Sequence, residues 1–413
     1  MPNFLIRELD RTSAGNIFST NHTVLVFGTA TETALEKANN DKVIDDNNII
    51  KLSSIADFTN YVGTDQGTPV EVTPNIISYG AQYAYELLRL GYSVLYKVID
   101  TSFNSDTMDY LKDKALYQFR YIVPAIDNTS DDTSNIRTTF YTNIKSIIDG
   151  TDQTSVSSMG RGDCIGLFDV TELATKIEDI QNDANISSSY IFWFTPYVYY
   201  SNLSKVDSDN FNNTKLPGSF HYFACLAKSL QQYPEWYAVA GYNRGTSDYS
   251  ISSVTTKLGE TAANKLQPRK ATTPPVNIIL TENDNFYLWG NRTASKSENG
   301  LTAENFANIR QLCCTLKKQI YSACRTLIFD PNSDLLWLNF CNTIRPTLER
   351  MVSLQGIKDY SFEQLETSIK GKLFAAVRIV PIEAVEDFEI AVTLEDNLDE
   401  TNVTVEEKLT GEE

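Results

Sequence analysis

Apolar runs alternate along most of this chain with segments of helical periodicity. Six runs are typical of buried strands: residues 23–28, 93–99, 119–126, 164–169, 190–194 and 236–241. Between them, apolar residues three or four positions apart predict four helices: residues 74–91, 134–147, 172–181 and 219–230. This alternation predicts an α/β fold, with a mainly parallel sheet that helices cover on both faces.

The pattern changes after a proline pair at residues 274–275. A short strand and turn are expected first, and then a long helix over residues 302–326. A second helix is predicted to begin after a cap at Asn332 or Ser333, and Pro346 should break or kink it. Two predicted strands complete this α+β region: residues 373–382 and 387–395.

Both ends of the chain carry apolar segments that have no evident hairpin partner. Residues 1–22 are predicted to be an extended arm with these apolar positions: Phe4, Leu5, Ile6 and Leu9. In the last predicted strand the apolar positions are Phe388, Ile390, Val392 and Leu394. A lone strand is unstable, whereas an open strand edge is a template for another chain. Strand addition between copies, in an open head-to-tail polymer, would satisfy both ends.

Charge narrows the classes of partner. The 413-residue chain has a formal net charge of −18, which argues against nucleic acid and against an anionic membrane surface. Residues 383–413 hold twelve acidic residues and one basic residue, whereas residues 296–378 hold eleven basic and eight acidic residues. This asymmetry predicts electrostatic contacts within or between copies, and we expect an acidic tail after residue 395.

Short segments of the sequence indicate the cellular compartment and whether the chain crosses a membrane. No secretory signal is expected in the first residues, because charges interrupt the apolar patch. The most apolar run, residues 190–200, is too short to span a membrane. The six cysteines form no C-x-x-C pair and are interpreted as free thiols in a reducing cytoplasm.

Catalytic and metal motifs are weak. The two histidines, His22 and His221, are more readily explained as structural than as catalytic residues, and no nucleophile elbow or P-loop is present. We expect no metal, no cofactor and no enzyme activity. An α/β hydrolase would remain a rival if either histidine lay beside a nucleophile. The Arg-Gly-Asp sequence at residues 161–163 is interpreted as a turn before a strand.

Several segments together resemble one protein family. They are "VPAID" (123–127), "GDCIGLFDV" (162–170), "YPEWYAVAGYNRG" (233–245), "YLWGNRT" (287–293), "NIRQLCCTLKKQIYSACRTLIFDPNSDLLWLNF" (308–340) and "VRIVPIEAVEDFEIAV" (377–392). In this order they are similar to the contractile tail sheath proteins of bacteriophages and related contractile particles. The resemblance covers about residues 115–395 and is weakest in the Asn/Ser/Asp-rich loops, at Pro346 and in the acidic extension.

The resemblance implies a multi-domain organisation. The central α/β domain would be subtilisin-like but non-catalytic, followed by an α+β C-terminal domain that faces a tube, with extended arms at both ends. The implied divisions are a linker arm (1–22), an N-terminal α/β part (23–114), the subtilisin-like domain (115–280), the C-terminal sheath domain (281–385) and the strand arm with its acidic tail (386–413).

The resemblance also implies a function. Subunits would form hexameric rings that stack helically around a tail tube protein, between a baseplate and the terminator or neck proteins. Contraction would drive the tube through the host envelope during genome ejection. The protein would belong to the virion, after assembly in the host cytoplasm. The alternatives are the sheath of a phage-derived injection device, an α/β hydrolase and, if the chain were exported, an adhesin.

Three groups of residues follow from the resemblance as candidate sites. A neighbour's arms would pair with an acceptor strand at Ala376, Val377, Arg378 and Ile379. A basic helix face is a candidate for contact with the tube or a neighbour, with a solvated face as the alternative: Arg310, Lys317, Lys318 and Arg325. A domain junction is expected at Trp289, Gly290 and Arg292, where a buried tryptophan, a turn and an arginine paired with a carboxylate or carbonyls would fix an angle.

Overall fold

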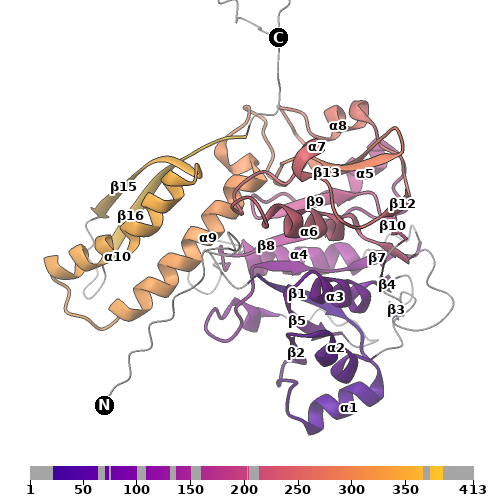
Figure 1. Ribbon diagram of the computed structural model, residues 1–413, viewed down its shortest axis with the longest axis horizontal. Helices are drawn as coiled ribbons and strands as arrows, with labels where there is room; N and C mark the ends of the chain where they lie inside the picture. The colour runs from indigo at the N-terminus through magenta and orange to yellow at the C-terminus, as the bar shows by residue number, and fades with distance from the viewer. Residues whose placement is uncertain are drawn as a thin grey trace, which may run out of the picture. The chain divides into compact units, whose positions relative to one another are not determined.

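The computed structural model describes residues 22–63, 70–73, 76–99, 108–130, 136–149, 160–201, 203, 214–365 and 373–384. The chain divides into two compact units, Met1–Glu383 and Ala384–Glu413. Every element described below belongs to the first unit. The fold is mixed α/β and is built on a large, mostly parallel sheet (Figure 1).

The large sheet has the strand order β14-β13-β9-β8-β6-β1-β5-β2. Its strands are β1 (Thr23–Gly28), β2 (Ile49–Leu52), β5 (Ser93–Val98), β6 (Tyr121–Val123), β8 (Ile165–Asp169), β9 (Ile191–Thr195), β13 (Val276–Glu282) and β14 (Asn285–Trp289). Neighbouring strands from β13 to β5 are parallel, and β14 and β2 are antiparallel at the two edges. The mainly parallel sheet predicted from the apolar runs is therefore confirmed.

Helices cover both faces of this sheet. They are α1 (Glu32–Asn40), α2 (Ile55–Tyr61), α3 (Gly80–Arg89), α4 (Ile136–Ile148), α5 (Ile177–Asp183), α6 (Gly218–Ser229), α7 (Gly241–Arg244) and α8 (Glu260–Leu266), with a 3-10 turn, η1 (Asp109–Lys112). Alternate residues of β1 point to opposite faces: Val24 and Val26 pack with α3 and α6, whereas Leu25 and Phe27 pack with α4, α5 and α8. Burial on both faces explains why the central strands are continuous apolar runs.

Two small antiparallel sheets flank the large one. Their orders are β3 (Val70–Thr73)-β4 (Ile76–Ser78)-β7 (Ile126–Asn128) and β11 (Thr214–Leu216)-β10 (Val198–Tyr200)-β12 (Ile251–Val254). The prediction of a helix from residue 74 was therefore wrong at its start. Ile76 and Ile77 pair with β7, and the helix begins at Gly80.

Three other predicted elements differ from the structure. Residues 119–126 are split between β6 and β7, because the chain turns at Ala125, whose φ is +52°. The helix predicted at 172–181 is α5, which begins only at Ile177. Residues 236–241 form no strand; Trp236 instead packs against the C-terminal helices, in a turn that precedes α7.

The C-terminal region contains two long helices and a strand pair. Its elements are η2 (Ala303–Asn305), α9 (Ala307–Cys324), η3 (Arg325–Leu327), α10 (Asp334–Ser353), β15 (Ile357–Leu365) and β16 (Phe374–Pro381). The predicted break at Pro346 was wrong. Helix α10 continues through Pro346, which lies on the exposed face, while Ile344 and Leu348 hold the opposite face in the core. The strand at 373–382 is confirmed as β16, but its partner β15 was not predicted, and residues 387–395 lie outside the described part.

Close packing of α3 on β1 gives a stability prediction. A Cβ added at Gly80 would lie 1.9 Å from the Phe27 carbonyl oxygen, a backbone atom that cannot move independently. We expect Gly80→Ala to lower the free energy of unfolding by about 1–3 kcal/mol through overpacking. At Gly259 a Cβ would meet nothing within 4 Å, so Gly259→Ala is the matched control. Urea unfolding checks both, and equal midpoints for the two variants would contradict the packing argument.

Candidate assembly interface

The strand pair β15–β16 contains the positions predicted to accept another strand. The two strands pair antiparallel from Ile357↔Pro381 to Leu365↔Phe374. No other described strand joins this sheet, so each strand has one edge without a described partner. The predicted acceptor positions Ala376 to Ile379 lie within β16, opposite residues 360–363 of β15.

Only one face of this sheet is packed. Tyr360, Phe362, Val377 and Ile379 pack against the core formed by α9 and α10. The other face is exposed to solvent and carries both Val380, which is 51% exposed, and an ion pair between Arg378 Nη2 and Glu363 Oε2, 2.5 Å apart. Exposed pairs contribute little to stability, so the sheet depends on its packed face. Two strands alone are marginally stable in water, and added strands would extend the same packed layer.

The predicted arms cannot be placed from the structure. Phe4, Leu5, Ile6 and Leu9 lie outside the described residues. The same holds for the second set: Phe388, Ile390, Val392 and Leu394. Their pairing with a neighbour stays a prediction.

The basic face of α9 turns mostly toward the parallel sheet. The Arg310 guanidinium donates to Ser189 Oγ (2.7 Å) and lies over the Tyr190 ring. Lys317 Nζ donates to the Gly162 carbonyl (3.0 Å) and to the Tyr190 hydroxyl (2.6 Å).

Lys318 completes this set of cations. Its Nζ donates to the Phe119 carbonyl (2.5 Å) and lies 3.8 Å from Asp163 Oδ2. These acceptors all lie just before the first residues of β6, β8 and β9. Helix α9 therefore crosses the amino ends of three parallel strands. Arg325 is different, because it is exposed and its guanidinium lies 5.9 Å from the Tyr321 ring. Contact of these cations with a tube stays a prediction.

The predicted junction lies where the chain leaves the large sheet, at the end of β14. The expectation of a buried tryptophan was wrong, because Trp289 is only half-buried, with its ring 5.3 Å from that of Tyr242. Gly290 has φ +130°. Asn277 brackets Arg292 by accepting from its N–H (2.9 Å) and donating to its carbonyl (2.8 Å).

The Arg292 side chain is buried, with the guanidinium 5.2 Å from the Phe306 ring. A backbone bridge also joins these two residues, immediately before α9 begins at Ala307. The motif thus lies at the entry to the C-terminal region. A role in fixing the angle between domains stays a prediction.

Sequence reasoning missed a buried ion pair beside α9. Arg120 Nη1 lies 3.0 Å from Glu235 Oε2, and the side chains are 0% and 3% exposed. Arg120 Nη2 also donates to the Gln311 carbonyl of α9 (3.1 Å). The available signal was a single charge inside each of two apolar segments, "FRYIV" and "PEWYAV", since buried charges are rare unless paired.

His221 lies beside one potential nucleophile, the Cys225 thiol, but both side chains are buried away from solvent. The distance between His221 Nε2 and Cys225 Sγ is 3.5 Å. Burial lowers the pKa of His221 to about 4 and raises the pKa of the Cys225 thiol well above its usual range, which favours the neutral pair. His22 lies 3.9 Å from Glu235, and burial, reinforced by Arg120, lowers its pKa to about 4.

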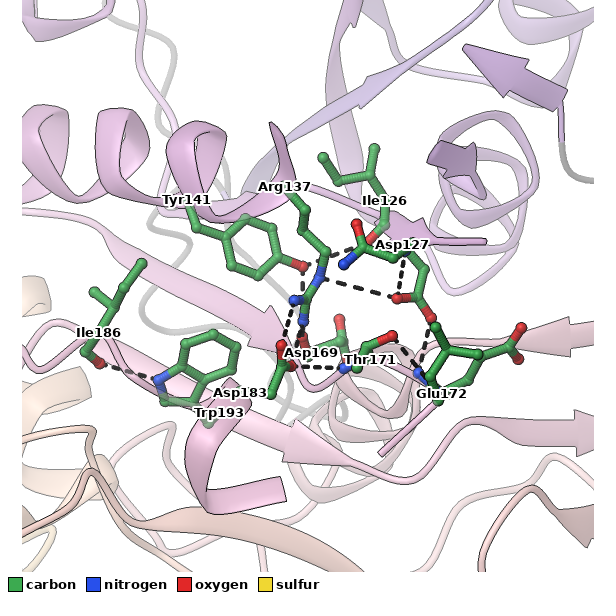
Figure 2. Close-up of polar contacts among 12 residues, drawn as sticks. Ile126, Asp127, Arg137, Tyr141, Asp169, Thr171, Glu172, Asp183, Ile186 and Trp193 are labelled. Carbon is green, nitrogen blue, oxygen red and sulfur yellow. Dashed lines mark hydrogen bonds and ion pairs between the residues drawn. The ribbon is translucent and has the colours of Figure 1, made fainter. Parts of the chain in front are cut away.

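The carboxyl ends of the strands, where α/β enzymes commonly bind substrates, are filled by internal polar contacts (Figure 2). Arg137 of α4 binds both carboxylate oxygens of Asp183, at 2.9 and 2.7 Å, and donates to the Asp169 carbonyl. Asp127 accepts from the Glu172 N–H at 2.9 Å. These bonds join the ends of β7, β8 and α5 to one another, rather than leaving their polar groups for a ligand.

Asp169 is the most perturbed carboxylate in this cluster. Its two oxygens accept from the N–H (2.7 Å) and the hydroxyl (2.6 Å) of Ser219, at the start of α6. Desolvation by burial raises the pKa of Asp169 to about 7, although the Ser219 hydrogen bonds oppose this rise.

The described residues contain neither a cluster of metal-binding side chains nor a membrane-spanning helix. No group of three or more His, Cys, Asp or Glu side chains among them is placed to hold a metal ion. No helix in that part of the chain is long and apolar enough to cross a membrane.

Comparison with known proteins rests on the fold. No family model and no curated protein sequence matches the chain. A chain of the anti-feeding prophage (AFP) baseplate is similar with a TM-score of 0.63 and 16% identity, over 96% of this chain and 99% of that one. The sheath complex of the PVC extracellular contractile injection system, in its contracted state, is similar with a TM-score of 0.62 and 15% identity. The match covers 96% of this chain and 98% of that one.

A third similar structure is the AFP helical sheath in its contracted state, with a TM-score of 0.58 and 16% identity over 95% of this chain and 99% of that one. This chain has the contractile-sheath fold. The similarity extends over nearly the whole of each chain, so the sheath fold includes the C-terminal helices and the β15–β16 sheet as well as the parallel sheet.

The buried Asp169 gives a pH prediction for this sheath fold. Because the pKa of Asp169 is raised in the folded state, the folded protein holds this proton more tightly than the unfolded chain does. The contribution of Asp169 to the free energy of unfolding therefore falls as pH rises from about 4 to about 7. Asp169→Asn keeps the shape and lacks this titration. We expect the stability of the variant relative to the parent to rise over that range, by at most about 1.4 kcal/mol per pH unit.

Urea unfolding at several pH values measures this difference. Asp179→Asn, at an exposed carboxylate of α5, is the control. A constant difference between Asp169→Asn and the parent across the range would contradict the assignment. The buried His221 and the half-buried His22 have lowered pKa values, so they affect stability in the opposite direction, and they are common to all three proteins.

Proposed function

We propose that this protein is a structural subunit of a contractile sheath, which polymerises around a tube and shortens to drive it forward. The observation that best supports this proposal is the fold, which this chain shares over 95–96% of its length with two contracted sheath structures. The half-packed β15–β16 sheet supports the same proposal, because two strand edges without described partners suit a protein that is completed by its neighbours.

Strand exchange would join the copies. The N-terminal segment around Phe4 to Leu9 and the C-terminal segment around Phe388 to Leu394 would each add a strand to a neighbour's β15–β16 sheet. Main-chain hydrogen bonds would supply affinity, and alternate apolar side chains would extend the packed layer over α10. Because donor and acceptor are different surfaces, the contact is heterologous and repeats without closing on a dimer.

Six subunits would form each ring, and rings would stack around a tube protein between a baseplate and a neck or terminator. In a virion such a sheath would drive genome ejection. A sheath of an injection particle is the second candidate, and it is favoured by the similarity to AFP and PVC chains, which come from a prophage and an injection system respectively.

A non-enzymatic role agrees with the buried surroundings of both histidines and with the filled carboxyl edge of the sheet. The central domain would keep a subtilisin-like topology without the catalytic residues. Work would come from interfaces that improve on contraction, and the subunits would turn as rigid bodies while the exchanged strands keep them linked.

Purified full-length protein should form hollow helical tubes or stacked rings at high concentration, because the heterologous contact does not close. Negative-stain electron microscopy is the measurement. A homogeneous monomer at every concentration tested, with the tube protein present as well as absent, would contradict the sheath proposal.

Deletion of residues 1–12 tests the arm. We expect a subunit with the parent's thermal unfolding temperature that no longer forms cohesive tubes, because the donated strand is absent. Truncation after residue 400, which removes part of the acidic tail but keeps the predicted strand, is the matched control. Tubes of normal length that still contract after the N-terminal deletion would refute the arm.

A further inference from the structure

The buried pair Arg120–Glu235 lies where three functional parts of the chain meet. Its charges are separated from water, with side-chain exposures of 0% and 3%. Such a pair contributes little net stability relative to an apolar pair, but it demands a narrow geometry, because each charge must keep its partners. This makes the pair a candidate for fixing orientation rather than for strengthening the fold.

The first part is helix α9. Arg120 donates to the Gln311 carbonyl, and the Thr315 hydroxyl donates to Glu235 Oε1. Gln311 and Thr315 are one helical turn apart, so the pair holds two consecutive turns of α9. Gln311 in turn donates to the Tyr121 hydroxyl at 3.1 Å, which ties the helix to β6.

The second part is the acceptor sheet. Trp236 follows Glu235 directly, and its indole N–H donates to the Leu354 carbonyl at 3.1 Å. Leu354 lies three residues before β15 begins, and a Cβ added at Gly356 would lie 2.9 Å from the Trp236 Nε1 atom. The start of the acceptor sheet therefore rests on the residue next to Glu235.

The third part is the segment from which the N-terminal arm leaves the body. The backbone N–H of Arg120 donates to the Thr23 carbonyl at 2.8 Å. His22, the first described residue, lies 3.9 Å from Glu235 and edge-on to the ring of Tyr92. The point at which the chain enters the sheet thus lies directly beside both residues: the Arg120 backbone holds Thr23, and the Glu235 carboxylate faces His22.

We propose that Arg120 and Glu235 are positioning residues that fix the place where the N-terminal arm leaves the subunit relative to the sheet that receives a neighbour's arm. The position of the arm exit relative to the acceptor sheet is fixed inside each subunit. It would therefore set the angle at which each copy is joined to the next. The consequence for assembly rests on the proposed sheath function, whereas the geometric claim concerns a single subunit.

The double variant Arg120→Gln/Glu235→Gln removes both charges and leaves no lone buried ion. We expect it to fold, because the two Gln amides can hydrogen-bond to each other, whereas removal of one partner leaves an uncompensated buried charge. Its α9 and acceptor sheet should have more freedom relative to the parallel sheet. The matched control is Lys145→Gln/Asp149→Asn, a half-buried pair at the C-terminal end of α4 in which Lys145 Nζ lies 3.5 Å from Asp149 Oδ2.

Spin labels at two exposed positions, Glu36→Cys on α1 and Lys358→Cys on β15, report this freedom in isolated subunits. The partly exposed Cys313 and Cys324 are changed to serine in every protein. We expect a single narrow distance distribution in the parent and the control, and a distribution at least twofold broader in the double variant. An unchanged distribution in a folded double variant overturns the proposal.

A milder variant keeps the test decisive if the double variant does not fold. Thr315→Val removes only the hydroxyl that donates to Glu235 and keeps the side-chain volume. Broadening of the same distribution, smaller than in the double variant, is expected. A distribution identical to that of the parent overturns the proposal here as well.

Tube assembly is the second readout. With a folded double variant, we expect tubes at least severalfold shorter than the parent's, while the control assembles normally. Parent-length tubes from a subunit with a broadened distribution would overturn the assembly consequence. A parent that forms no tubes would instead contradict the sheath function, and the spin-label result would still decide the geometric claim.

Discussion

Helix α9 is anchored across the amino ends of β6, β8 and β9, and the arrangement of the C-terminal region depends on this contact. Three cations and one amide side chain of α9 bind carbonyls and hydroxyls that precede or begin these strands. The amino end of a parallel sheet presents such groups because every strand starts there. One helix can therefore hold several strands, and α10 and the β15–β16 sheet pack against that helix.

The β15–β16 sheet, the proposed acceptor of a neighbour's strand, adds a second constraint. Strands β15 and β16 have one face on the core of α9 and α10 and two edges with no described strand partner. Backbone donors and acceptors along an open strand edge bind water or another strand, which makes such an edge prone to aggregation. In a protein that receives strands from its neighbours, the same open edge is a specific assembly contact. Anchoring through α9 would ensure that every subunit offers these edges in the same orientation, which a regular polymer requires.

The sequence predicted the parts of the fold in which local pattern and burial agree. The run at residues 23–28 is β1 because both of its faces are buried, and the same holds for most of 164–169 and 190–194. Pattern failed where a tertiary contact decided the structure, as at Ile76, which pairs with β7, and at Trp236, which packs on α9 and α10. Strand β15 had a signal, since Tyr360 and Phe362 alternate with polar residues, but its charged positions weakened it.

The candidate interface was less predictable than the fold. Lys317 and Lys318 were recognisable as one basic helix face, but a sequence does not show that the face points toward Gly162 and Phe119, more than 150 residues earlier in the chain. The Arg120–Glu235 pair joins residues 115 positions apart, and neither residue has a local pattern that names its partner.

Cross-linking across the proposed exchange tests the account most directly. A cysteine at Ile6 is combined in turn with a cysteine at Ser361 of β15 and at Val380 of β16, and assembled tubes are oxidised and separated under denaturing conditions. The account predicts a ladder of covalently linked chains for at least one pair, and monomers alone when the same proteins are oxidised in the unassembled state. Tubes that yield only monomers for both pairs would contradict strand exchange as the link between subunits.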